Sequence, residues 1–181
     1  GLGDVYKRQE LVAVFGDFDA DGVTGTALMV RALKKYGLGT IAYIPHRANE
    51  GHGLNLQAID YLSSRNINLI ITVDCGVTDA LAITYAKDRG IDSIVTDHHL
   101  ISSERPDAVA IINPHAPTSK YPFLHLTGVG MALKFAQALL ADENPDNWAD
   151  DLLELAAIGT ITDMAPLLGA VSYTHLTLPT I

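Results

Sequence analysis

The chain has 181 residues, of which 48% are hydrophobic and 18% charged, an ordinary composition for one globular domain with a sizeable core. Twelve Lys and Arg residues against 21 Asp and Glu residues give a net charge of −9, which excludes a domain that holds nucleic acid by a strongly basic surface. A single cysteine excludes an internal disulfide framework, whereas seven histidines beside many carboxylates favour oxygen and imidazole ligands for a divalent cation.

Short Val- and Ile-rich runs, typical of buried strands, alternate with helical patterns along the chain. The alternation indicates an α/β fold, a doubly wound and mainly parallel five-stranded sheet with helices on both faces and right-handed crossovers. In chain order we expect strand Leu11–Phe15, helix Val23–Tyr36, strands Thr40–Ile44 and Asn68–Val73, helix Thr78–Arg89, strands Ser93–Thr96 and Ala108–Ile112, and helices Val129–Ala141 and Trp148–Ile158.

The two ends of the chain do not continue this pattern. The stretch GAVSYTHLTLPTI from Gly169 is Thr-rich and lacks helical periodicity, and with the opening GDVYKRQ segment it is typical of translated adaptor sequence. We therefore expect residues 1–9 and 169–181 to be non-native and residues 10–168 to be one domain of a longer protein; a natural edge strand or tail is the alternative. No apolar run reaches the ~18–20 residues of a membrane helix and no signal peptide is evident, so we expect a cytoplasmic protein without membrane contact.

Three of the expected strands lead into an aspartate: Asp17 follows the first strand after Gly16, and Asp74 and Asp97 come directly after theirs. Because ligands of open parallel sheets bind at the carboxyl ends of the strands, we expect these carboxylates at one edge. They would repel one another and raise each other's pKa unless a cation lies among them. Four further candidates follow at once, Asp19 and Asp21 after the first strand and His98 and His99 after Asp97. Carboxylates mixed with imidazoles predict a divalent-metal site.

Each of these residues also has a simpler interpretation. A lone aspartate at a strand end is more often a turn former or a helix cap than a ligand. Asp21 can cap the helix that begins near Gly22, Asp79 is interpreted as a first-turn helix charge only, and His125 as a packing or surface residue. The repetition of acidic residues at one edge of one sheet favours the metal site over these alternatives.

Residues 17–22, DFDADG, imitate two other motifs. An EF-hand calcium loop is excluded because its twelfth position would be Leu28 instead of a bidentate Glu, and because a strand precedes it. In a haloacid-dehalogenase-type phosphatase, Asp19 would be the nucleophile and Asp21 the acid. That alternative leaves Asp74 and the Asp97-His98-His99 segment unexplained and ranks second.

Four ordered segments resemble the motifs of the DHH phosphoesterase superfamily, most closely its RecJ-like exonuclease branch. They are GDFDADG at 16–22, VDCG at 73–76, TDHH at 96–99 and GTITD at 159–163, and RANEGHGL at 47–54, INP at 112–114 and GVG at 128–130 are also similar to RecJ-like sequences. The resemblance implies a DHH domain in which Asp97 orients a histidine and His99 stabilises the phosphate or assists proton transfer. The metal ligands that it implies are Asp17, Asp19, Asp74, His98 and Asp163, while Asp21 matches a typical residue whose role stays open.

The resemblance further implies metal-dependent hydrolysis of phosphodiesters, as a 5′→3′ single-stranded-DNA exonuclease of DNA repair and recombination that uses two Mn²⁺ or Mg²⁺ ions. Single-stranded DNA is then the expected partner, together with C-terminal DHHA1 and oligonucleotide-binding domains of the same chain. Without those domains the fragment is expected to hold metal but to cleave poorly or not at all. Substrate contacts are expected from Arg47, His52 and the N–H groups of Gly128 and Gly130, with surface or close-packing roles as the alternative. Weaker candidates are Arg105 for a phosphate and Tyr121 and Trp148 for base stacking.

Several related functions remain as alternatives. Oligoribonucleases, cyclic-dinucleotide phosphodiesterases and inorganic pyrophosphatases of the superfamily typically begin with a His-x-x-Pro-Asp-x-Asp motif, which Phe15-Gly16-Asp17-Phe18-Asp19 lacks. A non-catalytic, Cdc45-like replication scaffold tends to lose ligand residues, whereas all of the expected ligands are present here. We therefore expect an enzyme of the RecJ-like type.

Overall fold

The computed structural model of the chain describes residues 11–101, 104–142 and 149–171. Its strands form one sheet in the order β2-β1-β3-β4-β5, and every neighbouring pair is parallel. The strands are β1 (Leu11–Gly16), β2 (Gly39–Tyr43), β3 (Leu69–Val73), β4 (Asp92–Thr96) and β5 (Ala110–Ile112). The predicted five-stranded α/β fold is confirmed, and each observed strand overlaps its prediction within two residues at either end.

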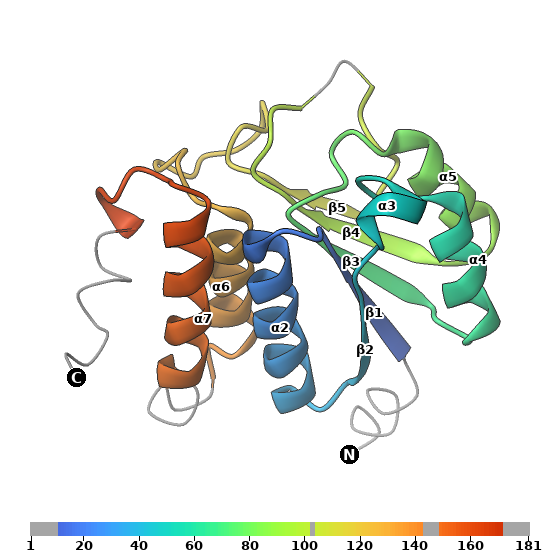
Figure 1. Ribbon diagram of the computed structural model, residues 1–181, viewed down its shortest axis with the longest axis horizontal. Coiled ribbons are helices and arrows are strands. Elements are labelled where there is room, and N and C mark those ends of the chain that lie inside the picture. The colour runs from blue at the N-terminus through green and yellow to red at the C-terminus, as the bar shows by residue number, and fades with distance from the viewer. Residues whose placement is uncertain (1–10, 102–103, 143–148, 172–181) are drawn as a thin grey trace.

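Helices cover both faces of the sheet (Figure 1). Helices α2 (Ala20–Lys35), α6 (Gly128–Leu139) and α7 (Ala149–Thr162) pack together on one face, and α4 (Leu56–Ser64) and α5 (Ala80–Asp88) lie on the other. Strand β1 shows why two cores form: Val12 and Val14 point to the first face, while Ala13 and Phe15 point to the second. All four are completely buried, so the Val- and Ile-rich run reflects a strand covered on both sides.

Two helices were missed by the sequence analysis, α4 and the single turn α3 (Arg47–Glu50). The sequence does carry a start signal for α4, the capping residue Asn55. Its side chain accepts a hydrogen bond from the N–H of Ala58 at 2.9 Å. Helix α7 continues to Thr162, beyond its expected end at Ile158, and Trp148 lies outside the described residues.

The register of the sheet aligns the residues that follow the strands. Gly16 pairs with Val73, Val73 with Thr96, and Thr96 with Ile112. The next residue of each strand therefore falls in one row along the carboxyl edge, in the order Asp17, Asp74, Asp97, Asn113. Within this row each aspartate N–H still donates to the neighbouring strand, to Val73, Thr96 and Ile112 respectively. The backbone hydrogen bonds between the strands thus fix the positions of the aspartates along the predicted acidic edge.

The expected domain boundary near residue 168 stays a prediction. Val171 is buried in a small apolar cluster with Leu126 and Met131, and residues 1–10 and 172–181 lie outside the described part of the chain. Within the residues that the structure describes, no helix is both long enough and apolar enough to cross a membrane.

Candidate metal centre

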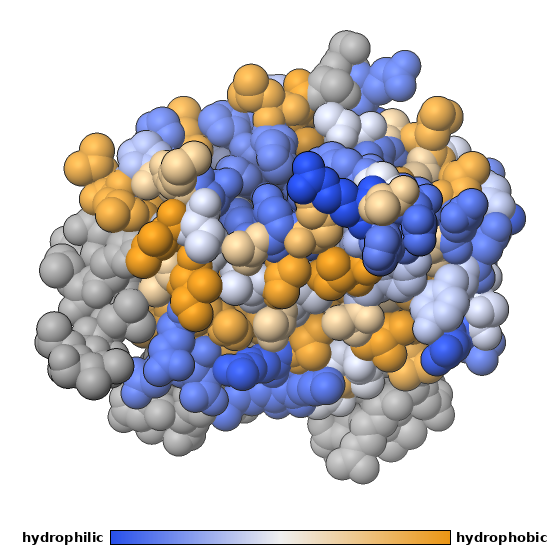
Figure 2. Space-filling model, viewed as in Figure 1, coloured by the Kyte–Doolittle hydropathy of each residue, from blue (hydrophilic) through white to orange (hydrophobic). Residues whose placement is uncertain are grey.

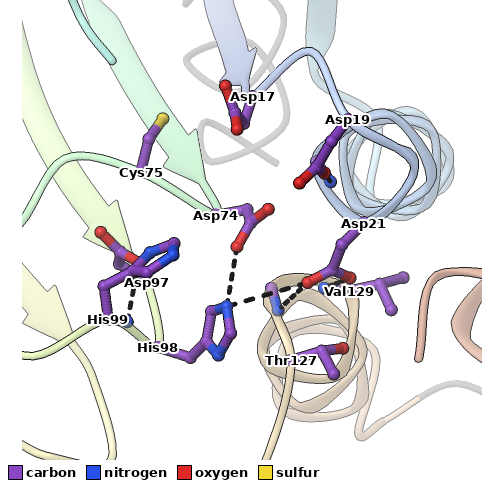
Figure 3. Close-up of polar contacts among 12 residues, drawn as sticks. Asp17, Asp19, Asp21, Asp74, Cys75, Asp97, His98, His99, Thr127 and Val129 are labelled. Atoms are coloured by element: carbon purple, nitrogen blue, oxygen red, sulfur yellow. Dashed lines mark hydrogen bonds and ion pairs between the residues drawn. The ribbon is translucent and has the colours of Figure 1, made fainter. Parts of the chain in front are cut away.

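The structure brings all five expected metal ligands to the carboxyl edge of the sheet (Figure 3 shows four of them). Three overlapping sets can each offer ligand atoms that lie within 4.8 Å of one another. One set is Asp17, Asp19 and Asp74; the second is Asp74, His98 and His99; the third is Asp21, His98 and Asp163. Because Asp74 and His98 are each shared by two sets, the geometry suits more than one cation.

The carboxylates of Asp17 and Asp74 fit a cation for a second reason. Each has an Oδ1 atom that is buried and makes no hydrogen bond within the described residues. Imidazole nitrogens lie near both oxygens, His52 Nδ1 at 3.1 Å from Asp17 and His98 Nε2 at 3.0 Å from Asp74. A buried carboxylate is costly unless a positive charge compensates for it, either a protonated imidazole or a cation, so these two side chains fit the metal that the sequence predicts.

Asp74 occupies the centre of the cluster and is held in an unusual backbone conformation. Its φ angle is +64°, in the left-handed region that aspartate tolerates better than most residues. Burial raises the pKa of Asp74 to about 7, although the neighbouring His98 opposes this shift. Burial alone would lower the pKa of His98, but the Asp74 carboxylate outweighs it and leaves that pKa above its ordinary value.

These pKa values predict that cation binding depends on pH. A metal ion must displace the proton from Asp74, whose metal-free pKa is about 7, and it must also find His98 deprotonated. The Mn²⁺ affinity should therefore rise as pH increases between about 6 and 8, by up to roughly tenfold per pH unit for each proton displaced. Titration calorimetry in buffers of different ionisation enthalpy measures both the affinity and the number of protons released. An affinity that is flat across this range would contradict the shared Asp74–His98 site.

Asp97 and His99 form a separate pair beside the cluster. The Asp97 carboxylate is 1% exposed and lies 2.7 Å from Nδ1 of His99, while its other oxygen accepts the N–H of Val77. Burial would raise the pKa of Asp97, but the hydrogen bonds from His99 and Val77 outweigh it and lower that pKa. In turn the hydrogen bond to Asp97 raises the pKa of His99 to about 9. His99 is thus oriented by Asp97 and protonated at neutral pH.

Asp21 has a different role from the helix cap that the sequence suggested. The cap of α2 is Asp19, which accepts the N–H of Gly22 at 2.9 Å. The Asp21 carboxylate, 1% exposed, instead accepts the N–H groups of Gly128 and Val129 at the start of α6. Burial raises the pKa of Asp21 despite these two donors. Asp21 therefore joins α2 to α6 beside His98, whose Nε2 lies 3.9 Å from Asp21 Oδ2.

The same contacts bear on the phosphate-binding role expected for Gly128 and Gly130. The N–H of Gly128 donates to Asp21 and that of Gly130 donates to Thr127 Oγ1, so a phosphate would have to displace both acceptors. Close packing explains Gly128 instead, because a Cβ at this position would lie 2.4 Å from the Cβ of Asp74. The start of α6 thus supports Asp74 and Asp21, and phosphate binding by Gly128 and Gly130 stays a prediction.

Asp163 reaches the cluster from the end of α7. It follows Thr162, the last residue of that helix, and is half-buried beside His98 and Asp21. Burial raises the pKa of Asp163, as expected for a carboxylate among other carboxylates without a cation. The segment 159–163 thereby brings an expected ligand to a sheet edge from which it is remote in sequence.

Two of the expected substrate-binding residues lie on the opposite side of the cluster. The His52 ring packs edge-on against Phe18, with centroids 5.9 Å apart, and the Arg47 guanidinium lies 4.9 Å from the Phe18 ring centre. His52 is flanked by Gly51 and Gly53, both with a φ of +78°. This turn places the imidazole beside Asp17, so Arg47 and His52 stay candidates for contact with a phosphate.

Asp79 is a residue whose role the sequence analysis missed. It stands at the cap position of α5 but makes no capping hydrogen bond there. Its carboxylate instead accepts the N–H of Leu54 at 2.7 Å, and a Cβ at Gly53 would lie 2.7 Å from both of its oxygens. Asp79 therefore fastens the turn that carries His52. No local sequence signal could have found this, because the partners are 25 residues apart.

Replacing Asp79 by alanine should release this turn. The Leu54 N–H loses its acceptor, and we expect a loss of about 1 kcal/mol in the free energy of unfolding, since the hydrogen bond is half-buried. Hydrogen exchange of the Leu54 amide should accelerate and the His52 ring should lose its fixed place beside Asp17. Asp79→Asn keeps an acceptor oxygen and should retain most of the protection. Equal exchange rates in the alanine variant and the parent would show that Asp79 does not hold the turn.

The remaining candidates lie apart from these contacts. Arg105 is exposed on the loop between β4 and β5, and Tyr121 lines a separate hollow of about 300 Å³ that also includes Met131 and Lys134. His125 is exposed and packs edge-on against Phe123. None of these three contacts the carboxylate cluster through a described hydrogen bond or ion pair.

A parallel sheet whose carboxyl edge gathers carboxylates and imidazoles defines a class of α/β protein built to hold divalent cations. Residues 11–160 match the DHH family, N-terminal domain, and the chain belongs to this family. The single-stranded-DNA-specific exonuclease RecJ of Bacillus subtilis is 46% identical over 161 residues, which cover 89% of this chain and 20% of that protein. RecJ of Thermus thermophilus is 36% identical over 172 residues, covering 93% of this chain and 24% of that protein.

Solved structures show the same relationship. A crystal structure of exonuclease RecJ bound to manganese superimposes with a TM-score of 0.82 at 33% identity, covering 96% of this chain and 44% of that one. CDC45 from Entamoeba histolytica shares the fold alone, with a TM-score of 0.60 at 15% identity over 92% of this chain and 32% of that one. The chain thus spans less than a third of the length of the RecJ proteins to which it is similar in sequence.

Proposed function

We propose that the chain is the catalytic DHH domain of a RecJ-like exonuclease, which hydrolyses phosphodiester bonds of single-stranded DNA from the 5′ end with Mn²⁺ or Mg²⁺. The observation that carries the proposal is the sharing of Asp74 and His98 between overlapping ligand sets. Within the described residues, the buried Oδ1 atoms of Asp17 and Asp74 lie next to imidazole nitrogens only, His52 Nδ1 and His98 Nε2. Such an arrangement is suited to a pair of cations. The relatives named as single-stranded-DNA-specific exonucleases support the substrate class.

The side chains of the cluster have two different proposed roles, cation binding and proton donation. Asp17, Asp19, Asp74, His98 and Asp163 would hold the cations, which supply activation of water and neutralisation of the phosphodiester charge when bound. The hydrogen bond to Asp97 orients His99 and raises its pKa, so His99 can donate a hydrogen bond or a proton to a phosphate oxygen. The net charge of −9 is then no obstacle to binding an anionic strand, because the cations replace a basic surface at the scissile phosphate.

The finer features of the proposal rest on the relatives. They are three to five times as long as this chain, which supports further domains in the whole protein, among them the DHHA1 and oligonucleotide-binding domains. Those domains would extend the contact with single-stranded DNA beyond the cluster. The 5′→3′ direction of cleavage, the preference for DNA over RNA and the role in repair and recombination are proposed for that whole protein.

The proposal can be tested with a small phosphodiester, whose hydrolysis requires the metal centre but no contact with further domains. The chain, saturated with Mn²⁺, should release nitrophenol from thymidine 5′-(4-nitrophenyl phosphate), and a chelator should abolish the release. His99→Ala should lower kcat by about 10²–10⁴-fold, since it removes a proton donor. Because His99 can also join Asp74 and His98 in one ligand set, the Mn²⁺ affinity of the variant is measured beside its kcat. A 5′-phosphorylated single strand, the matching duplex and the RNA strand then compare substrate classes. Because the isolated domain is expected to cleave poorly, the deciding measurement is made on the full-length protein that carries it. A folded, Mn²⁺-loaded full-length protein that hydrolyses neither the ester nor any strand would contradict the proposal.

A further inference from the structure

A hollow adjoins the carboxylate cluster on the side where α7 ends. Its wall toward the cluster is formed by His98 and Asp163, and the rest is lined chiefly by His115, Leu124, His125 and Met164. Its volume is about 280 Å³, near the lower limit of the ~300–1,000 Å³ typical of ligand sites. It can therefore hold a single nucleotide unit rather than a longer segment.

Exposed apolar side chains stand at the rim of this hollow. Met164 is 88% exposed and Leu124 is 44% exposed. Figure 2 shows hydrophobic surface at this end of the molecule, to the left of the polar surface above α2. Met164 also has a φ of +55°, a conformation that a non-glycine residue rarely adopts. Apolar side chains beside a polar site offer a face on which a base can pack, whatever its identity.

The lining of the hollow also includes two imidazoles, His115 and His125, on the loop between β5 and α6. Buried Asn113 fixes the start of this loop, because its amide donates to the carbonyl of His99 at 2.9 Å and its Oδ1 accepts the N–H of His115 at 2.7 Å. Asn113 is the last member of the row Asp17, Asp74, Asp97, Asn113. The backbone of His115 is thereby tied to that of His99 at the cluster, and both loop imidazoles can bond to phosphate or sugar oxygens.

We propose that this hollow binds one nucleotide of the substrate strand, the one next to the phosphodiester held at the carboxylate cluster. Its base packs against Met164 and Leu124, and its sugar and phosphate face His115 and His125. The occupant is continuous with the scissile phosphodiester because the hollow shares His98 and Asp163 with the cluster. This inference rests on the proposed function and assigns to it a site for the neighbouring nucleotide.

The methionines of the chain allow a direct test. There are three, and Met29 and Met131 are buried, so in a chain labelled with ¹³C at the methionine methyl groups only Met164 reports on the hollow. Adding thymidine 5′-monophosphate to the Mg²⁺-saturated chain should shift the Met164 methyl resonance saturably, with a Kd on the order of 1 mM, and leave the Met29 resonance in place. Because it lacks the base, 2-deoxyribose 5-phosphate should shift Met164 much less.

Variants separate this site from the metal centre. The double variant His115→Ala, His125→Ala should raise the Kd for thymidine 5′-monophosphate at least about threefold, while its Mn²⁺ affinity stays at the parental value. Lys120→Ala removes a cation from the same loop outside the hollow and should change neither constant. A chain that binds Mn²⁺ but whose Met164 resonance does not respond to the nucleotide would overturn the nucleotide site and leave the metal centre standing. An equal response to the sugar phosphate would overturn the base contact.

Discussion

Replacing Asp74 by asparagine is expected to lower the affinity of the chain for Mn²⁺ by at least about 100-fold. Asparagine has the same shape and tolerates the φ of +64°, so the backbone of the β3 end should not be disturbed. What changes is the charge of the side chain shared by two of the ligand sets. Titration calorimetry with Mn²⁺ on the parent and the variant measures the effect, and circular dichroism checks that both are folded.

The stability of the metal-free variant provides an independent check. Burial disfavours the charged form of Asp74 and raises its pKa to about 7, above the ordinary 3.8. The native state therefore binds this proton more tightly than the unfolded state, and the free energy of unfolding falls as pH rises from about 4 to 7. The neutral asparagine removes this cost, so the variant should be at least as stable as the parent at pH of about 8. The exposed Asp88→Ala is the matched control and should change neither property. If Asp74→Asn binds Mn²⁺ as tightly as the parent, Asp74 is not a central ligand of the site.

Gly128→Ala should damage both the fold and the metal centre. The new Cβ would lie 2.4 Å from the Cβ of Asp74 and 2.6 Å from its Oδ1, distances that real contacts do not reach. Gly128 begins α6 and its N–H donates to Asp21, so α6 cannot move away from Asp74 without losing that hydrogen bond. We expect a loss of about 1–3 kcal/mol in the free energy of unfolding, from overpacking, and a weaker Mn²⁺ affinity. Urea unfolding and calorimetry measure the two effects.

Gly130→Ala is the control for this prediction, on the same helix and two residues away. Its Cβ would come no closer than 3.3 Å, to the end of the flexible Leu126 side chain. Alanine is also a better helix former than glycine by about 1 kcal/mol, so this variant should be as stable as the parent or more stable. If both variants unfold and bind Mn²⁺ alike, the close approach of α6 to Asp74 is not what requires glycine at position 128.

The sheet and its acidic edge were predictable from the sequence because both depend on local patterns. Runs such as Leu69–Val73 are apolar except for the buried Thr72, and the aspartate that follows each run takes its position from the strand before it. The resemblance of the ordered motifs then added Asp163, which no local pattern connects with the sheet. Helix α4 was overlooked because it is short and its cap, Asn55, is a residue equally common in turns.

The supporting contacts were not predictable because both partners have to be known. Asp21 and Asp79 each have an obvious local role as an acidic residue at a helix start, and in the folded chain neither caps the helix at whose start it stands. Asp21 reaches Gly128, 107 residues further along, and Asp79 reaches back to Leu54. In both cases tertiary packing supplies a backbone donor that competes successfully with the nearby helix. Residues of this kind can be recognised only once the helices have been packed against the sheet.

The row of residues along the carboxyl edge has a consequence for how this chain can vary. Adjacent strands lie about 4.8 Å apart, so the backbone ladder alone sets the distances between the points from which Asp17, Asp74 and Asp97 extend. Exchanging one apolar residue for another inside β1, β3 or β4 leaves that spacing unchanged. Inserting or deleting a single residue within one of these strands would shift its aspartate by about 3.3 Å along the strand and turn it to the other face. Substitution of one apolar residue for another within these strands is therefore compatible with the cation site, whereas a change in strand length is not.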